Sequence, residues 1–402
     1  MGFLKMKKTL AALAVLGAFA GSAVAADVTL YGVVDYGFLY NYTDEDTVDG
    51  VSEDSNSFAL ESGVNSPSRF GLKGSEDLGN GMTVSFILEN GFNADDGTLG
   101  QGSRLFGREA SVSLTGAFGK VSFGRMGGVA SSAGSYDLVY GIGDAFDGGD
   151  NAIIGFAMSD RYDNMVTYQT PVFAGLQVTA QYSFKEDGKD GQGNEGDFSS
   201  SDRYASVALT GEYGPAQFVA AWEIQKYGYE KAGAERVLND DANTFYLGGN
   251  YDFGVAKVFA LGQYFQHLQN INVNGSDLFG EDSITEFVLP AGAGEYTDGI
   301  KGYGLHLGTI VPVAGGDLTV GAYYVDFKLD NSEKLKTFWE DANYYGLAAR
   351  YEYPLSKRTL VYTGAGYGEF TVDGVKEFAA YGFGDDYKNK LVQAYVGLKH
   401  TF

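Results

Sequence analysis

Hydrophobic and polar residues alternate along most of this chain. Leu176, Val178 and Ala180, for example, are separated by polar residues, and the same period of two recurs in 318–324 and 392–398. A period of two places apolar side chains on one face of a β-strand and polar side chains on the other. The pattern therefore predicts an all-β chain.

Sixteen such segments are expected, and the connections between them alternate strictly between short and long. Tight turns on one side and long loops on the other are typical of a transmembrane barrel, whereas a soluble sandwich gives no reason for the alternation. We therefore predict a 16-stranded antiparallel transmembrane β-barrel with both termini on the side of the tight turns. The expected strands are residues 28–42, 66–74, 82–92, 105–115, 120–126, 161–171, 176–185, 202–213, 216–227, 242–253, 256–268, 301–313, 316–329, 341–354, 358–371 and 388–402.

One long connection, residues 127–160, differs from the others and is called the constriction segment below. It has no clear period, is rich in Gly, Ala and Ser, and contains acidic residues but neither Lys nor Arg. A structureless run of this length is unusual inside a compact domain. We therefore expect this third long loop to fold into the barrel and narrow its pore. Its acidic residues are Asp137, Asp144, Asp147, Asp150 and Asp160.

Composition supports a barrel in a membrane. The polar faces of the strands carry mainly Gly, Ser, Thr and Gln, which suit a water-filled interior. The chain has 59 Gly, 29 Tyr and 28 Phe, and the aromatic residues crowd strand ends, as expected for girdles at the two membrane interfaces. Beyond residue 25 no run of ~20 apolar residues could form a membrane-spanning helix. A closed barrel is the remaining way to cross a bilayer.

Residues 1–25 have the features of a cleaved secretory signal peptide. Lys5, Lys7 and Lys8 precede an apolar run, and Ala23-Val24-Ala25 gives a small-x-small cleavage pattern. Cleavage is expected after Ala25, with Ala26 as the alternative. Residues 26–402 would then form the barrel.

Charge excludes nucleic acid as an expected partner. The net charge is −24, and removal of three lysines with the signal gives −24 − 3 = −27. The chain has no Cys, so neither disulfides nor thiol chemistry is expected.

Four segments resemble the Gram-negative general (diffusion) porin family. They match its first strand, its second strand, the strand before the third loop and its C-terminus ending in Phe. This resemblance implies a homotrimer of outer-membrane barrels, each with the third loop folded into its lumen. The segments are residues 27–35, 68–74, 118–125 and 396–402.

The resemblance also implies a constriction between acidic residues of that loop and basic residues of the wall. Opposed charges across a narrow pore order water and favour small polar solutes. Strand alternation agrees with a wall position for Arg69 and Lys73, whereas Arg108 needs a bulge near Gly107 or a place at the rim. On the loop, Asp144-Ala145 stands where the family has Pro-Glu. The expected wall residues are Arg69, Lys73, Arg108, Arg125 and Arg161, and the expected loop acids are Asp137, Asp144, Asp147 and Asp150.

The function expected from these features is passive diffusion of ions and small hydrophilic solutes across the outer membrane. The three histidines lie in separate strands without a catalytic motif, so we expect no enzyme, cofactor or metal site; His306 is expected to face the lumen. Expected partners are outer-membrane lipid, lipopolysaccharide and the barrel-assembly machinery, which would read the terminal Phe402. Three acids against three bases at the constriction, with acidic mouths, would give a weak cation preference at low salt.

Two alternatives remain open. The barrel could be a surface adhesin or antigen whose long loops, 269–300 above all, bind a host or phage component. It could also be a substrate-specific channel, with Tyr136, Tyr140 and Phe146 contributing to an aromatic track.

Overall fold

The computed structural model describes residues 28–46, 52–184, 202–226, 230–232, 235–237, 240–268, 271–273, 299–330, 341–373 and 386–402. Almost all regular structure in these ranges is β-strand. The strands are β1 (Thr29–Asp46), β2 (Ser52–Ser62), β3 (Arg69–Gly79), β4 (Met82–Gly91), β5 (Glu109–Gly116), β6 (Gly119–Gly127), β7 (Gly155–Phe156), β8 (Arg161–Gln169), β9 (Leu176–Ser183), β10 (Arg203–Tyr213), β11 (Ala216–Lys226), β12 (Glu230–Ala232), β13 (Glu235–Val237), β14 (Ala242–Asp252), β15 (Lys257–Leu268), β16 (Asn272–Val273), β17 (Ile300–Val313), β18 (Gly316–Leu329), β19 (Asp341–Pro354), β20 (Thr359–Asp373) and β21 (Asp386–Thr401).

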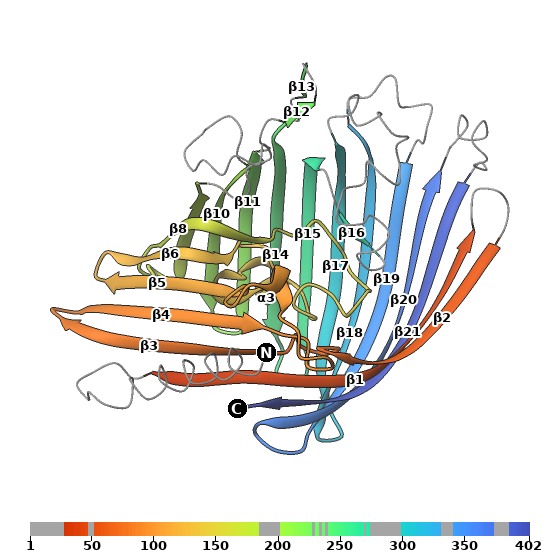
Figure 1. Ribbon diagram of the computed structural model, residues 1–402, viewed down its shortest axis with the longest axis horizontal. Coiled ribbons are helices and arrows are strands. Elements are labelled where there is room, and N and C mark those ends of the chain that lie inside the picture. The colour runs from red at the N-terminus through yellow and green to blue at the C-terminus, as the bar shows by residue number, and fades with distance from the viewer. Residues whose placement is uncertain are drawn as a thin grey trace, which may run out of the picture.

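The large sheet closes on itself. Each long strand pairs antiparallel with the next in sequence, and β21 pairs with β1 from Val33↔Thr401 to Asp46↔Lys388. Figure 1 shows this seam, with the red β1 beside the dark blue β21. Strand β2 pairs with the C-terminal part of β1, and β3 pairs with its N-terminal part. Together β2 and β3 therefore form one interrupted strand of the wall. Counted in this way, the predicted closed barrel of sixteen antiparallel strands is confirmed.

The two faces of the barrel differ as the alternation predicts. On β17, Leu305 and Leu307 are 52% and 62% exposed and point outward, whereas His306 between them is 4% exposed and points inward. The same alternation on β18 exposes Val320 and buries Thr319. In a bilayer the exposed apolar side chains would contact acyl chains. The opposite face is called the inner face below.

One expected connection is wrong. Residues 43–65 were expected to form a long loop, but β1 continues to Asp46 and β2 returns along it from Ser52 to Ser62. The sequence 52–58 alternates weakly and is strongly polar, so its period of two does not stand out. Pairing with β1 nevertheless satisfies its backbone hydrogen bonds, which outweighs its low strand propensity. The real interruption of the wall lies at residues 63–68.

The connections contain little regular structure. A short helix α2 (Gly100–Ser103) lies between β4 and β5. The constriction segment contains a 3₁₀ turn, η1 (Gly134–Tyr136), a short helix, α3 (Val139–Gly143), and β7, which pairs with β16. Among the described residues, no helix is long and apolar enough to span a membrane. The expected signal peptide, residues 1–25, lies outside the described residues, as does most of loop 269–300.

The main hydrophobic cluster joins the constriction segment to the inner face. Val139, Tyr140, Ile153 and Phe156 are fully buried. They pack with inward side chains of β14 to β20, including Tyr246 and others on the same face. In Figure 1, α3 is drawn in front of β14 and β15, with which it is in contact. Burial of this apolar surface holds the segment to the wall.

Candidate pore constriction

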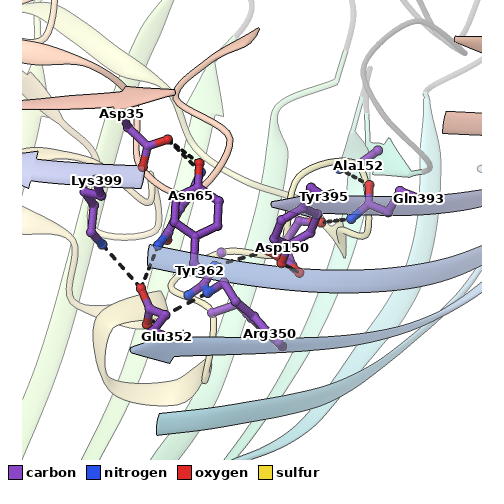
Figure 2. Close-up of polar contacts among 12 residues, drawn as sticks. Asp35, Asn65, Asp150, Ala152, Arg350, Glu352, Tyr362, Gln393, Tyr395 and Lys399 are labelled. Atoms are coloured by element: carbon purple, nitrogen blue, oxygen red, sulfur yellow. Dashed lines mark hydrogen bonds and ion pairs between the residues drawn. The ribbon is translucent and has the colours of Figure 1, made fainter. Parts of the chain in front are cut away.

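The C-terminal half of the constriction segment is fixed to β19 and β21 through Asp150. Its carboxylate accepts a hydrogen bond from Arg350 Nη1 at 3.1 Å and another from the Tyr395 hydroxyl. Gln393 donates to the Asp150 carbonyl at 2.9 Å and accepts from the Ala152 backbone at 3.3 Å (Figure 2). Asp150 is 1% exposed. Burial raises the pKa of Asp150, while the neighbouring Arg350 opposes the rise.

The middle of the segment is fixed to β17 and β18 through Asp144. Tyr323 donates to the Asp144 carboxylate at 2.9 Å, and His306 Nε2 lies 3.3 Å from it. The Ala145 backbone donates to His306 Nε2 at 3.2 Å, which confirms that His306 faces inward. Burial raises the pKa of Asp144, and His306 and these hydrogen bonds limit the rise.

Two buried glutamates fix the segment on either side of this middle part. Glu109 on β5 accepts hydrogen bonds from the Ser135 backbone at 3.1 Å and from its hydroxyl at 2.9 Å. Glu223 on β11 accepts from Tyr204 and from Tyr246, the latter at 3.1 Å. The same Tyr246 hydroxyl lies 2.9 Å from the Ala157 carbonyl of the segment, an alternative acceptor for its proton. Wall strands from β5 to β21 thus hold the segment along its length.

Glycines on the inner face make room for the segment. A Cβ at Gly308 would lie 2.6 Å from the Ala145 methyl, and one at Gly321 would lie 2.9 Å from the Phe146 ring. A Cβ at Gly366 would lie 2.5 Å from Ile153. Any larger residue at these positions would push the segment away from the wall. The backbone of the wall therefore approaches the segment as closely as glycine permits.

Arg69 and Arg108 meet at Glu89 on β4. Arg108 Nε lies 2.7 Å from the Glu89 carboxylate, and Arg69 Nε lies 3.9 Å from it. The Tyr31 hydroxyl also donates to Glu89, at 2.9 Å. Arg108 precedes β5, which begins at Glu109, so strand alternation does not direct its side chain outward. The conflict noted in the sequence is resolved because Arg108 stands before the strand.

Arg125 and Arg161 complete a basic cluster on this side of the barrel. Arg125 Nη1 lies 2.8 Å from Asp163 and donates to the Arg161 carbonyl at 3.1 Å. A register shift between Gly124 and Met126 interrupts the alternation of β6 at this residue. Arg161 interacts electrostatically with Arg108 and Arg125. The basic cluster is defined here as Arg69, Arg108, Arg125 and Arg161.

Lys73, the fifth expected wall residue, lies apart from the basic cluster. Its ammonium group stands over the Tyr31 ring, 5.0 Å from the centroid. Residue 73 is exposed and lies four residues further along β3 than Arg69. Its charge therefore acts at a different depth of the barrel.

Four of the five acidic residues of the segment fall into two pairs with different surroundings, and the fifth, Asp160, accepts the Arg161 backbone N–H at 2.6 Å. Asp144 and Asp150 are buried against the wall as described above. Asp147 is exposed, in a left-handed conformation with φ of 59°, and its carboxylate faces that of Asp137. A Cβ at Gly141 would lie 3.7 Å from Asp147 Oδ1 and 3.9 Å from Asp137 Oδ2. Burial, and then the facing Asp147, raise the pKa of Asp137 well above its usual range.

The aromatic residues of the segment do not form an exposed track. Tyr136, Tyr140 and Phe146 are 1%, 0% and 5% exposed. Tyr140 packs edge-on against Tyr246, and Phe146 lies under the Arg350 guanidinium, 5.1 Å from its ring centroid. The suggestion that these rings contact solute is wrong because their faces are occupied by the wall.

A comparison with protein families decides the assignment. The family model described as Gram-negative porin matches residues 11–373. The chain belongs to the Gram-negative porins. Over 99% of its length this porin is 34% identical to the full length of an outer membrane porin protein of Bordetella pertussis. It is 30% identical to the full length of outer membrane porin protein 32 of Delftia acidovorans, again over 99% of its own length.

Solved structures show the same fold. An anion-selective porin from Comamonas acidovorans is 24% identical and aligns over 94% of this chain and all of its own, with a TM-score of 0.59. A trimer form of the Vibrio cholerae outer membrane protein OmpT is 16% identical and aligns with a TM-score of 0.57 over 94% of this chain and all of its own. The family predicted from the sequence is confirmed. This porin forms a water-filled channel for passive diffusion of ions and small hydrophilic solutes across a Gram-negative outer membrane.

Several residues of the site were missed in the sequence. Glu89, Arg350 and Glu352 were not singled out, although each is inward-facing and charged. For Arg350 a signal existed, because Leu347 and Tyr351 take the opposite face of the same strand. Pairing Arg350 with Asp150 across 200 residues needed the path of the segment, which alternation does not give.

Proposed function

We propose that the narrowest part of this channel lies between the constriction segment and the basic cluster, and that it favours small anions. Together with Arg104, which also bonds Asp163, the four arginines of the cluster face three carboxylates, Glu89, Asp160 and Asp163, which leaves 5 − 3 = +2 on that side. Asp144 accepts hydrogen bonds from Tyr323 and from the backbone of Phe146 and Gly148, and Asp150 is paired with Arg350. Their charges are buried against the wall instead of facing the channel, and this one observation supports the proposal most strongly.

The weak cation preference expected from the sequence rested on counting Asp144, Asp147 and Asp150 as free charges. Of these three, only Asp147 is exposed in the structure. Asp147 faces Asp137, and burial favours one proton on such a pair of carboxyls. With about one negative charge left on this part of the segment, the arginines dominate locally. Distant acidic loops are screened beyond ~8 Å at physiological salt.

Solute entry into liposomes tests this proposal. Two solutes of equal size, one a small carboxylate and one a small ammonium ion, are compared with a neutral sugar in swelling assays. We expect the carboxylate to enter fastest and the order to weaken as salt rises. Faster entry of the ammonium ion would refute the anion preference without affecting the channel assignment.

Assembly and targeting form a second part of the proposal. Residues 1–25 direct export and are removed, and residues 26–402 fold as a homotrimer in contact with lipid and lipopolysaccharide. Phe402 is proposed to be the signal that the barrel-assembly machinery reads. Two observations support this role: its side chain is exposed, and its backbone bonds to Gly32 on β1 at the barrel seam. Secretion with a mature N-terminus at Ala26, and a trimer on native gels, would agree.

Neither alternative has gained an observation in its favour. The channel is proposed to work without catalysis or a cofactor, as diffusion through a porin requires neither. An adhesin would depend chiefly on loop 269–300, most of which lies outside the described residues. A silent trimer in planar bilayers would favour the adhesin over the diffusion channel.

A further inference from the structure

The interruption between β2 and β3 is an ordered inward bulge. Ser62 pairs with Tyr36 and Arg69 pairs with Val33, so residues 63–68 stand opposite only Val34 and Asp35. The surplus residues leave the plane of the wall. This excess is larger than the one extra residue of an ordinary β-bulge.

Asp35 holds the bulge in place. Its carbonyl accepts the Gly63 backbone N–H at 2.9 Å, and its carboxylate accepts the Asn65 backbone N–H at 3.4 Å. Tyr362 on β20 donates to the same carboxylate at 2.5 Å. Asp35 and Ser68 also bond to each other through the Asp35 backbone N–H and the Ser68 hydroxyl, at 3.1 Å. These contacts fix the bulge against the inner face.

The bulge reaches sideways to the strands that hold the constriction segment. Asn65 Nδ2 donates to Glu352 at 2.6 Å, and Lys399 lies 3.4 Å from the same carboxylate. Figure 2 shows Asn65 and Lys399 converging on Glu352, with Arg350 beside it and bonded to Asp150. The bulge and the segment are therefore attached to neighbouring points of one polar network.

The end of the bulge holds Arg69. Arg69 Nη1 donates to the Ser66 hydroxyl at 3.2 Å and to the Pro67 carbonyl at 2.9 Å. Its side chain stays 25% exposed and interacts electrostatically with Asp147 of the constriction segment. Two acceptors from one rigid turn fix the direction of a guanidinium better than a single contact does. Pro67 restricts the backbone of that turn.

We propose that bulge 63–68 is a selectivity element of the channel, which positions the Arg69 guanidinium beside the path of small anions through Ser66. This inference rests on the proposed anion preference and adds to it the element that sets the position of one charge. Ser66 is a positioning residue. It acts through Arg69 and is not itself expected to bind solute.

Ser66→Ala removes one of the two acceptors of Arg69 and leaves the other charges unchanged. If the guanidinium then moves from about 6 to about 9 Å from the ion path, the anion-to-cation permeability ratio falls about twofold. Removing the charge by Arg69→Gln lowers the ratio by up to about tenfold. Both variants are measured as purified trimers in planar bilayers under a salt gradient. Ser66→Thr keeps the hydroxyl and should restore the ratio of the unsubstituted porin.

The double variant separates positioning from general loosening. In the Arg69→Gln background, Ser66→Ala should have no further effect on the ratio. An equal effect in both backgrounds would overturn the inference, because Ser66 would then act without Arg69. If Arg69→Gln lowers the ratio and Ser66→Ala does not, the bulge has no such role and the anion preference stands. If Arg69→Gln leaves the ratio unchanged, the charge assignment at this residue fails and the inference fails with it.

Discussion

The contact between Asp150 and Arg350 should decide whether the constriction segment stays on the wall. Asp150→Asn removes the carboxylate and leaves the Arg350 guanidinium, only 12% exposed, facing a neutral amide. Loss of one partner of a buried ion pair costs about 3–5 kcal/mol. Glu352 lies 3.9 Å from Arg350 Nε and compensates in part, so the lower end of that range applies.

A cost of about 3 kcal/mol shifts the equilibrium between docked and undocked segment about a hundredfold. The hydrogen bonds of Gln393 to the Asp150 carbonyl and the Ala152 backbone N–H would remain, so the segment should detach transiently. We expect single-channel records of Asp150→Asn to show added current noise and brief openings of higher conductance. The barrel itself should stay folded, since its sheet does not depend on this contact.

Asp147→Asn is the matched control. It makes the same chemical change three residues earlier on the same segment, at an exposed position. This variant should change the permeability ratio but add no noise. Equal noise in both variants, or quiet Asp150→Asn channels of unaltered conductance, would refute the view that this ion pair docks the segment.

Three further predictions concern the segment and the barrel seam. Gly366→Ala brings a methyl group against Ile153 and should lower the stability of the folded porin by about 1–3 kcal/mol. Gly262→Ala, where the nearest atom to the new methyl lies at 3.6 Å, should have no such effect. Equal melting temperatures of the two variants would contradict this prediction. Because the pKa of Asp137 is raised well above its usual range, the proton that it shares with Asp147 should leave only as the pH rises, which makes the segment more negative and lowers anion permeability. Asp137→Asn should remove this pH step in reversal-potential measurements, and a step that persists would exclude Asp137 as its origin. Deletion of Phe402 should reduce the folded trimer recovered from outer membranes, and an undiminished heat-modifiable trimer would argue against its role in assembly.

The alternation of apolar and polar residues was enough to predict the fold because it is a local property of each strand. The face taken by Val320 or Leu305 follows from its neighbours along one strand, and a closed barrel repeats that rule. Residues 52–62 were not predicted as a strand because they are polar. A polar strand nevertheless pairs as well as an apolar one when its partner, β1, is already in place. Strand propensity was a weaker guide there than hydrogen bonding.

The site was less predictable because its contacts are between residues far apart in sequence. Arg69 and Arg161 could be placed on the wall, and Asp144 and Asp150 on the segment, but which charges neutralise each other depends on where the segment lies. Arg350, which lies outside every recognised motif, forms an ion pair with Asp150 and so neutralises its charge. The count of free acids was therefore too high. Selectivity follows from that count.

The zero-current potential of the purified trimer in a potassium chloride gradient measures the anion preference of the narrowest part of the channel. The two ions have similar mobilities, so the sign of the potential reports the charge that the narrowest part presents. We expect stepwise channels that favour chloride at about 0.1 M salt and lose much of that preference near 1 M, where the Debye length shrinks to about 3 Å. A potential of the opposite sign, favouring potassium at low salt, would contradict this expectation.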